Sequence, residues 1–215
     1  MRVKVVVFDW DGTLIDSEQH IVSCIAHAAT VVGLPELTYD RMKSIIGLGM
    51  KEALMDLYPA ITESQVQSLR EHYSARFHDD ASAGLELFPG VEETLNSLKE
   101  KGIRLAVATG KSRRGLEIAK KTSGLGDFFE IERCADETKS KPHPQMLHEL
   151  IDYFGVSAQE MVMVGDTSFD MEMASRASMP AVGVSYGVHH STDLQNWKPQ
   201  VIVDQMPELL GWLGL

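Results

Sequence analysis

The sequence predicts an α/β fold, a doubly wound parallel sheet that carries an inserted all-helical domain. Residues 3–8 form an apolar run of strand length, rich in β-branched side chains, as expected of a strand buried on both faces. After Pro89, helical and strand-like patterns alternate, which indicates right-handed βαβ units. Residues 16–87 have helical periodicity without a strand-like run. We therefore expect a core of residues 1–15 and 88–215 and a helical insertion of residues 16–87.

The expected elements of the core follow one another as helix, then strand. Helices are expected over residues 91–101, 113–122 and 169–177, with another that follows Pro144 and ends at 154 and a last one that ends at 213. Strands are expected over residues 103–108, 129–133, 161–164, 181–184 and 201–203. Parallel strands joined in this way have their carboxyl ends at one edge of the sheet, which is where ligands of such folds bind.

The helical insertion has its own start and stop signals. Ser17 is a candidate N-cap for the first helix, and Thr62-x-x-Gln65 has the form of a capping box at the start of the longest one. Shorter helical patterns lie between them, at residues 39–46 and 51–58. The chain is expected to return to the core through Ala83-Gly84 and residues 88–90.

The composition excludes several classes of protein. A chain of 215 residues with 44% hydrophobic residues can bury a globular core. Its net charge of -11 argues against binding nucleic acid or an anionic membrane through overall charge, although a local basic pocket remains possible. The first apolar run is too short for a signal peptide or a membrane span, and Cys24 and Cys134 lack metal-ligand spacing. We therefore expect a cytoplasmic protein with two reduced, packed thiols.

Polar side chains follow three of the expected strands. Asp9 and Asp11 come after the first strand, Thr109-Gly110 after a second, and Asp166 with Asp170 beyond it after a third, while Lys141 lies in a fourth connection. An Asp-Gly pair after one strand can be a simple turn, but the repetition favours a site. Carboxylates from two strands can share Mg²⁺, and hydroxyl, N–H and ammonium donors suit a phosphoryl group.

These residues resemble four motifs of the haloacid dehalogenase superfamily of phosphohydrolases. The motifs match the run DWDGTLIDS from Asp9, the run VATG that ends at Gly110, the Lys-Pro pair at Lys141 and the run GDTSFD from Gly165. The resemblance covers nearly the whole chain and implies a Rossmann-like core with an α-helical C1-type cap in the insertion. Trp10 departs from the more usual Leu or Phe, and strand alternation predicts that its side chain packs away from the site.

The resemblance implies a role for each site residue. Asp9 would attack phosphorus and form an aspartyl phosphate, and Asp11 would act as general acid and base. Thr109, Gly110 and Lys141 would hold the phosphoryl group. The implied Mg²⁺ ligands are Asp9, Asp166 and Asp11, the last through its backbone carbonyl. Asp170 would orient Lys141 or a metal-bound water from outside the ligand set.

The resemblance is nearest to phosphoglycolate phosphatase-like enzymes, which implies a small phosphorylated metabolite as substrate and a monomer as default. Lys51, in the loop Gly47-Leu48-Gly49-Met50-Lys51, could bind an anionic group of the substrate, or it could be solvated in an ordinary turn. A sugar-phosphate mutase of the β-phosphoglucomutase type is an alternative, although His20 stands one position early for its cap histidine. A non-catalytic binding module is a second alternative.

Two further groups of residues admit a functional and a structural interpretation. A basic cluster follows the second motif, and we expect a solvated helix face, with Lys111 and Arg113 near enough to add positive field to the site. The other members of the cluster are Arg114, Lys120 and Lys121. The pair His189-His190 has no matching ligand spacing, so we expect a pair of surface loop residues in preference to a metal site.

Overall fold

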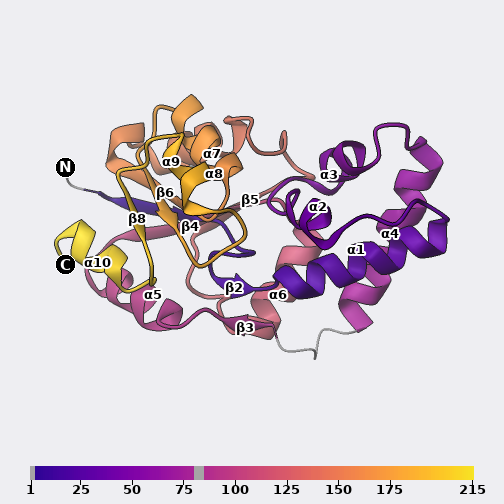
Figure 1. Ribbon diagram of the computed structural model, residues 1–215. Coiled ribbons are helices and arrows are strands. Elements are labelled where there is room, and N and C mark those ends of the chain that lie inside the picture. Colours follow the sequence, from indigo (N-terminus) through magenta and orange to yellow (C-terminus); the bar gives the residue numbers. More distant parts are fainter. Residues whose placement is uncertain (1–2, 80–84) are drawn as a thin grey trace.

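The computed structural model describes residues 3–79 and 85–215. Two bodies are visible, a core built around a sheet and a group of four helices beside it (Figure 1). The core contains both ends of the described chain, and the four helices are inserted between the first and second strands of the main sheet. This arrangement confirms the predicted α/β fold with a helical insertion.

The main sheet has six strands, all parallel, in the order β5-β4-β1-β6-β7-β8. Its strands are β1 (Val5–Phe8), β4 (Arg104–Thr109), β5 (Ile131–Cys134), β6 (Met161–Gly165), β7 (Ala181–Val184) and β8 (Val201–Val203). Every residue of β1 is fully buried, because β1 lies between β4 and β6 and its side chains pack against helices on both faces of the sheet. Phe8 aligns with Val107 of β4 and Val164 of β6, so the three strands end close together.

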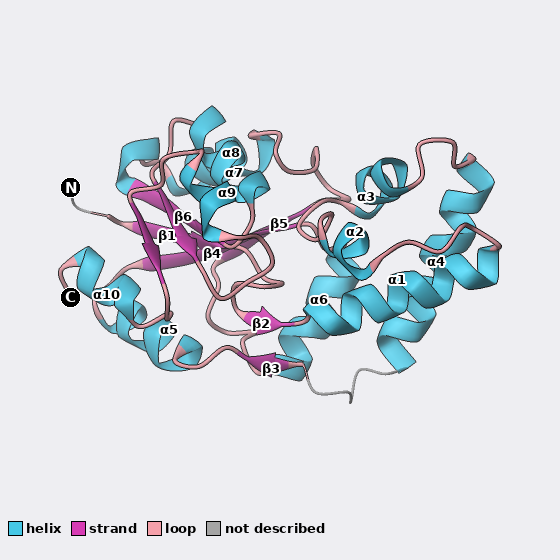
Figure 2. Cartoon of the chain, in the orientation of Figure 1, coloured by secondary structure: helices cyan, strands magenta, loops and turns pink. Residues whose placement is uncertain are grey.

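Helices cover both faces of the sheet (Figure 2). On one face, Val6 and Phe8 pack with α5 (Val91–Glu100), α6 (Arg113–Ser123) and α10 (Glu208–Leu213). On the other face, Val5 and Val7 pack with α7 (Gln145–Phe154), α8 (Ser168–Arg176) and α9 (Ser191–Gln195). Successive side chains of a strand point to opposite faces, and this alternation divides the core into two apolar layers.

The insertion has a separate apolar core. It consists of α1 (Glu18–Val32), α2 (Tyr39–Lys43), α3 (Met50–Leu57) and α4 (Glu63–Asp79). Side chains such as Ile25, Leu54 and Leu69 are buried among these helices. The predicted capping box is present before α4, where Gln65 N–H donates to Thr62 Oγ1 over 3.3 Å and Thr62 N–H donates to Gln65 Oε1 over 3.0 Å.

Two very short strands join the insertion to the core. They are β2 (Ile15–Asp16) and β3 (Glu86–Leu87), which pair antiparallel where the chain leaves and re-enters the core. The prediction of no strand in residues 16–87 was wrong here, because a two-residue ladder is too short to show a period. The predicted return through Ala83-Gly84 lies outside the described residues.

Most predicted boundaries in the core agree with the structure to within one or two residues. The strand expected over 129–133 begins two residues later, at Ile131. Two short elements were not predicted, α9 and the 3₁₀ turn Ala158–Glu160 before β6. Ser17 precedes α1 as expected, but its side chain makes no capping hydrogen bond to the helix.

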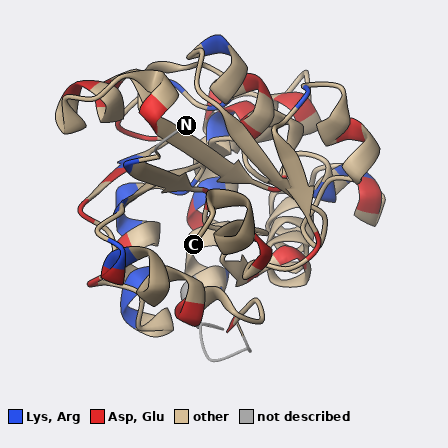
Figure 3. Cartoon of the chain, turned by 90° about the vertical axis from the view of Figure 1, so that its left-hand side faces the viewer, with Lys and Arg blue, Asp and Glu red and all other residues tan. Residues whose placement is uncertain are grey.

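Charged residues of both signs occur together on several helices (Figure 3). Within residues 3–79 and 85–215, no helix combines the length and apolarity that crossing a bilayer requires. Cys24 and Cys134 are both buried, as expected of packed thiols.

Candidate active site

The parallel register brings the predicted strand-end residues to one edge of the sheet. Asp9 follows β1, Thr109 ends β4, and Asp166 follows β6, and all three are at most 1% exposed. Lys141, from the connection between β5 and α7, is also buried. Burial of four polar side chains is costly unless each has partners, so the contacts among them determine what this edge can do.

Three carboxylates form an acidic cluster. One oxygen each from Asp9, Asp166 and Asp170 lies within 4.8 Å of the others. Asp166 is held by Thr13 Oγ1, which donates to its Oδ1 over 2.7 Å, and by Val188 N–H, which donates to its Oδ2 over 2.8 Å. Burial, with Asp170 close by, raises the pKa of Asp166 to about 7. Oxygen ligands in such a group suit a hard divalent cation.

Asp170 is fixed by the first turn of α8. Its Oδ2 accepts hydrogen bonds from Thr167 N–H over 3.0 Å and from Thr167 Oγ1 over 2.7 Å, which completes a capping box. The position before this turn must be glycine, because a Cβ on Gly165 would lie 2.4 Å from Asp170 Cγ. The other carboxylate oxygen of Asp170 is thereby directed toward the cluster.

Gly12 is required by the same close packing. Its φ of +78° favours glycine, and a Cβ there would lie 2.2 Å from Asp166 Oδ2. The turn after the first strand therefore brings the backbone against the carboxylate that follows β6.

Lys141 bridges two members of the acidic cluster. Its Nζ lies 2.7 Å from Asp9 Oδ1 and 2.7 Å from Asp170 Oδ1. Burial would lower the pKa of this ammonium, but Asp170 and Asp9 outweigh burial and raise it. Lys141 therefore stays charged, and it is the lysine of the connection that reaches the cluster.

Asp9 has one carboxylate oxygen in use and one without a partner. Its Oδ1 accepts from Trp10 N–H over 2.7 Å and pairs with Lys141, whereas its Oδ2 is buried without a hydrogen-bond donor among the described residues. Burial raises the pKa of Asp9 well above its ordinary value, Lys141 opposes this, and Asp170 and Asp166 add to it. A divalent cation next to this oxygen would satisfy it and offset the repulsion, so these residues fit a metal.

Asp11 points away from the acidic cluster, although it is only two residues from Asp9. Its Oδ1 accepts a hydrogen bond from Ser17 Oγ over 2.6 Å, and its Oδ2 lies 3.0 Å from Lys111 Nζ. The Lys111 ammonium also lies 4.7 Å from the centre of the Phe77 ring of α4. The expectation of a solvated helix face was therefore wrong for Lys111, which is about 10% exposed. The feature of the sequence that could have placed Lys111 at the site is its position two residues after Thr109.

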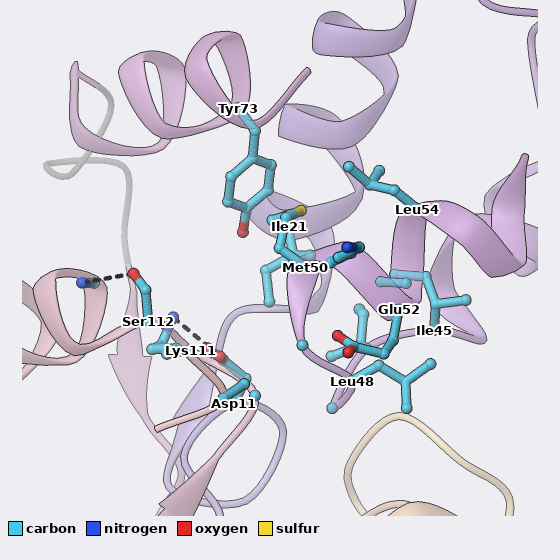
Figure 4. A pocket seen from close by; sticks show the side chains of 18 of the residues that line it. Asp11, Ile21, Ile45, Leu48, Met50, Glu52, Leu54, Tyr73, Lys111 and Ser112 are labelled. Atoms are coloured by element: carbon cyan, nitrogen blue, oxygen red, sulfur yellow. Dashed lines mark hydrogen bonds and ion pairs between the residues drawn. The ribbon is translucent and has the colours of Figure 1, made fainter. Parts of the chain in front are cut away.

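A cavity of about 460 Å³ lies between the core and the insertion (Figure 4). Asp9, Asp11 and Lys111 contribute to the core side. Helices α1, α3 and α4 supply the opposite side, and Gly110 lies at the boundary. In Figure 4 the Asp11 carboxylate and the Lys111 ammonium meet beside this cavity. The two aspartates after β1 are thus separated in space, one in the acidic cluster and one facing the cavity.

The loop before α3 docks on the core across this cavity. Gly49 N–H donates to Ser140 Oγ over 2.7 Å, next to Lys141. A Cβ on Gly110 would lie 2.5 Å from the Leu48 carbonyl oxygen and 2.6 Å from that of Gly47. The loop backbone therefore rests directly on the turn after β4.

Comparison with known proteins agrees with this arrangement of fold and acidic cluster. The model of the haloacid dehalogenase-like hydrolase family matches residues 6–184, which is most of the chain. The chain belongs to this family. It is therefore a hydrolase with the core, the helical insertion and the buried acidic cluster described above.

Individual relatives within the haloacid dehalogenase-like family have different names. The probable phosphatase IndB of Dickeya dadantii is 35% identical, over 96% of this chain and 91% of its own. The pyrophosphatase PpaX of Bacillus cereus is 30% identical, over 100% of this chain and 98% of its own. A predicted phosphoglycolate phosphatase from Haemophilus somnus is 25% identical with a TM-score of 0.89, covering 99% and 98% of the two chains. These names do not agree on one substrate.

The remaining candidate residues of this family member lie in varied surroundings. Lys51 lines the cavity but is exposed, and no ion pair engages it within the described part of the chain. Thr109 is buried, with its Oγ1 accepting from Lys111 N–H over 3.1 Å. Arg113 lies outside the cavity and pairs with three glutamates, Glu117, Glu132 and Glu137.

None of the three histidines considered from the sequence joins the acidic cluster. His20 packs its ring on Phe77, at 4.5 Å between centroids, and is not among the described residues that line the cavity. His189 is half-buried, with Nδ1 accepting from Ser168 N–H over 3.1 Å. Burial lowers the pKa of His189. His190 is exposed and precedes α9, as expected of a loop residue.

Proposed function

We propose that the protein is a Mg²⁺-dependent phosphatase that hydrolyses a small phosphomonoester through an aspartyl phosphate on Asp9. One observation carries this proposal. Lys141 and the acidic cluster hold Asp9 with one oxygen that has no hydrogen-bond donor among the described residues, while Asp11 faces the cavity 3.0 Å from Lys111. Two carboxylates in such different surroundings are suited to different steps, one to nucleophilic attack and the other to proton transfer.

The acidic cluster would hold Mg²⁺ through Asp9 and Asp166, together with the backbone carbonyl of Asp11. When bound, Mg²⁺ would supply positive charge that offsets repulsion between carboxylates and phosphate oxygens. Lys141 supplies a second, fixed positive charge at Asp9, and Asp170 keeps that ammonium in place over 2.7 Å. Thr109 and the N–H of Gly110 would hold the transferring phosphoryl group.

Two side chains, Asp9 and Asp11, take part in the chemical step. An oxygen of Asp9 attacks phosphorus, and the bond from phosphorus to the ester oxygen breaks. In its protonated form Asp11 gives a proton to that leaving oxygen, and the resulting carboxylate then takes a proton from the water that hydrolyses the aspartyl phosphate, a role that typically contributes ~10²–10⁴-fold. The Ser17 hydroxyl and the Lys111 ammonium hold the Asp11 carboxylate toward the cavity.

Phosphoglycolate is one candidate substrate, because Lys51 at the cavity could meet its carboxylate. The site gives the mutase alternative no histidine of its own, since His20 packs on Phe77 and is not among the described residues that line the cavity. A binding module without catalysis would leave no use for the unpartnered oxygen of Asp9 beside Lys141. We further expect a cytoplasmic monomer, which light scattering and cell fractionation would test.

The first prediction concerns the nucleophile. Asp9→Asn should abolish Mg²⁺-dependent phosphate release, because an amide cannot form the phosphoenzyme, while the circular dichroism spectrum stays that of the wild type. The measurement is phosphate release from a panel of small phosphomonoesters with and without excess EDTA. Exposed Asp152→Asn in α7 is the matched control and should retain wild-type turnover. Near-normal release by Asp9→Asn, or full activity in EDTA, would contradict the proposal.

A further inference from the structure

The side of the cavity that faces Asp11 from the helical insertion is largely apolar. Ile21 and Ile25 come from α1, Met50 and Leu54 from α3, and Phe77 from α4. Figure 4 shows Ile21, Met50 and Leu54 on the side of the cavity opposite Asp11. An apolar wall favours ligand atoms that gain by leaving water and penalises charged groups that lose their hydration. The leaving part of the substrate must occupy this region, because the phosphoryl group lies at Asp9.

The charges around the cavity do not favour a second anionic group. The carboxylates among the lining residues are Asp9, Asp11, Glu52 and Asp136, and the basic residues are Lys51, Arg70 and Lys111. The Lys111 ammonium is already paired with Asp11. Lys51 and Arg70 are exposed, as are Glu52 and Asp136, so these four charges are screened by water. A carboxylate or second phosphate on the leaving group would therefore lie near the Asp11 carboxylate without a buried, unpaired cation of its own.

Tyr73 of α4 presents an uncharged aromatic surface to the same region. Its ring stacks on Phe77, with 5.5 Å between centroids and 25° between planes. Figure 4 shows its hydroxyl pointing into the cavity from above, between Ser112 and Met50. Burial, with Asp11 close by, raises the pKa of Tyr73 well above its ordinary value, so the hydroxyl stays neutral. The Tyr73 hydroxyl makes no hydrogen bond to another described residue, which leaves it available to a ligand.

We propose that the leaving group of the substrate is an uncharged alcohol with an apolar face, and that this face packs against Tyr73. This inference rests on the proposed phosphatase function and narrows its substrate class. It disfavours phosphoglycolate and pyrophosphate, whose leaving groups carry negative charge. Tyr73 is then a specificity residue, because it contacts the part of the substrate that does not react.

A panel of four substrates tests the charge and the apolar face separately. The substrates are benzyl phosphate, ethyl phosphate, phosphoglycolate and pyrophosphate, each at saturating Mg²⁺. We expect kcat/KM for benzyl phosphate to exceed that for ethyl phosphate by at least ~10-fold, since added apolar contact in a pocket is typically worth this much. Phosphoglycolate should be cleaved more slowly than ethyl phosphate, from which it differs by a carboxylate.

The outcomes separate this inference from the proposed function. A higher kcat/KM for phosphoglycolate or pyrophosphate than for both uncharged esters would overturn the inference and leave the phosphatase standing. Release of phosphate from none of the four substrates would contradict the phosphatase itself, and the inference with it.

Substitution of Tyr73 tests whether this residue causes the preference for benzyl phosphate over ethyl phosphate. Tyr73→Ala should lower kcat/KM for benzyl phosphate by ~10-fold and change the value for ethyl phosphate by less than about twofold. Tyr73→Phe retains the ring and should retain the preference for benzyl phosphate. Exposed Tyr153→Ala in α7 is the matched control for loss of a tyrosine and should keep both values. An equal loss for both esters in Tyr73→Ala, or a larger selective loss in Lys51→Ala, would overturn the assignment.

Discussion

At the scale of single residues, three consecutive side chains after β1 have three different destinations. Asp9 joins the acidic cluster, Trp10 enters the apolar layer beneath α5 and α6, and Asp11 faces the cavity. Trp10 is 1% exposed, and its ring meets Phe129 edge-on at 5.9 Å between centroids. The expectation that Trp10 packs away from the site is confirmed. Its large ring anchors the segment that carries both aspartates.

A second prediction follows for Trp10. Trp10→Ala should lower the free energy of unfolding by roughly 3–5 kcal/mol, because it removes a fully buried aromatic side chain and leaves a cavity. Trp10→Phe should lose less than half as much free energy of unfolding as Trp10→Ala. It should keep most of the turnover, since the aromatic ring at position 10 contacts the core and not the substrate. Denaturant unfolding and phosphate release measure the two effects.

Trp197 supplies the control for this prediction. It is 37% exposed, so Trp197→Ala should change stability by less than about 0.5–1 kcal/mol. Equal losses of stability at Trp10 and Trp197 would contradict the anchoring role of Trp10.

The sequence predicts which residues gather at the sheet edge, but not how each one is used. Asp9, Asp166 and Lys141 were predictable because parallel strands end at one edge. The contacts of the Asp11 side chain could not be predicted in this way. Ser17 was expected to cap α1 and instead donates to Asp11. Lys111 was expected near enough to the site to add positive field, but on a solvated face and without a partner, and it instead pairs with Asp11. The Lys111 contact depends on the register of β1 and β4, and the Ser17 contact on how the chain turns out of the core, and neither is encoded in a local pattern.

At the scale of elements, the loop before α3 connects the insertion to three parts of the core. Gly47 lies against Thr167, where a Cβ would come within 3.2 Å of Oγ1. The carbonyls of Gly47 and Leu48 lie over Gly110, and Gly49 donates to Ser140. The glycines in the sequence indicate this loop, but they do not predict its contacts. The glycines allow the two backbones to approach more closely than side chains would permit.

A third prediction tests this docking. Gly110→Ala should raise KM and lower kcat, so that kcat/KM falls by ~10-fold or more. The reason is that displacing active-site groups by about 1 Å can have effects of this size. The added Cβ would lie 2.5 Å from the Leu48 carbonyl oxygen, which is backbone and cannot rotate away. Steady-state kinetics with the best ester of the panel provide the measurement.

Gly126→Ala is the matched control for Gly110→Ala. A Cβ on Gly126 would come no closer than 4.0 Å to another heavy atom, the Lys120 carbonyl oxygen. This variant should retain wild-type kcat and KM. Wild-type kinetics in Gly110→Ala would mean that the loop moves freely and does not depend on this contact.

At the scale of the whole molecule, the acidic cluster is stabilised poorly by the protein's own charges. Three carboxylates share one ammonium, so two negative charges remain if all are ionised. The net charge of the chain is -11, so more distant residues do not offset them. A folded state that concentrates negative charge in this way should gain stability from a bound divalent cation.

The dependence of stability on Mg²⁺ and pH therefore provides a test that requires no substrate. At 100 times its Kd, a ligand of the native state stabilises by about 2.7 kcal/mol. For a chain of this size, that corresponds to a rise in Tm of roughly 5–10 °C. The pKa of Asp166 is raised to about 7 in the folded protein, so its contribution to stability is present at low pH and is lost as pH rises through 7. Without Mg²⁺, Tm should therefore fall from pH 6 to pH 8.

The rise in Tm caused by Mg²⁺ should be larger at pH 8, where Mg²⁺ does not have to displace a proton from Asp166. Asp166→Asn removes one of the proposed ligands and should lose most of this rise, whereas exposed Asp152→Asn should keep it. Differential scanning calorimetry at both pH values measures these shifts. An equal rise in Asp166→Asn and in the wild type would place the bound ion elsewhere, because the cluster would then not be what the cation stabilises.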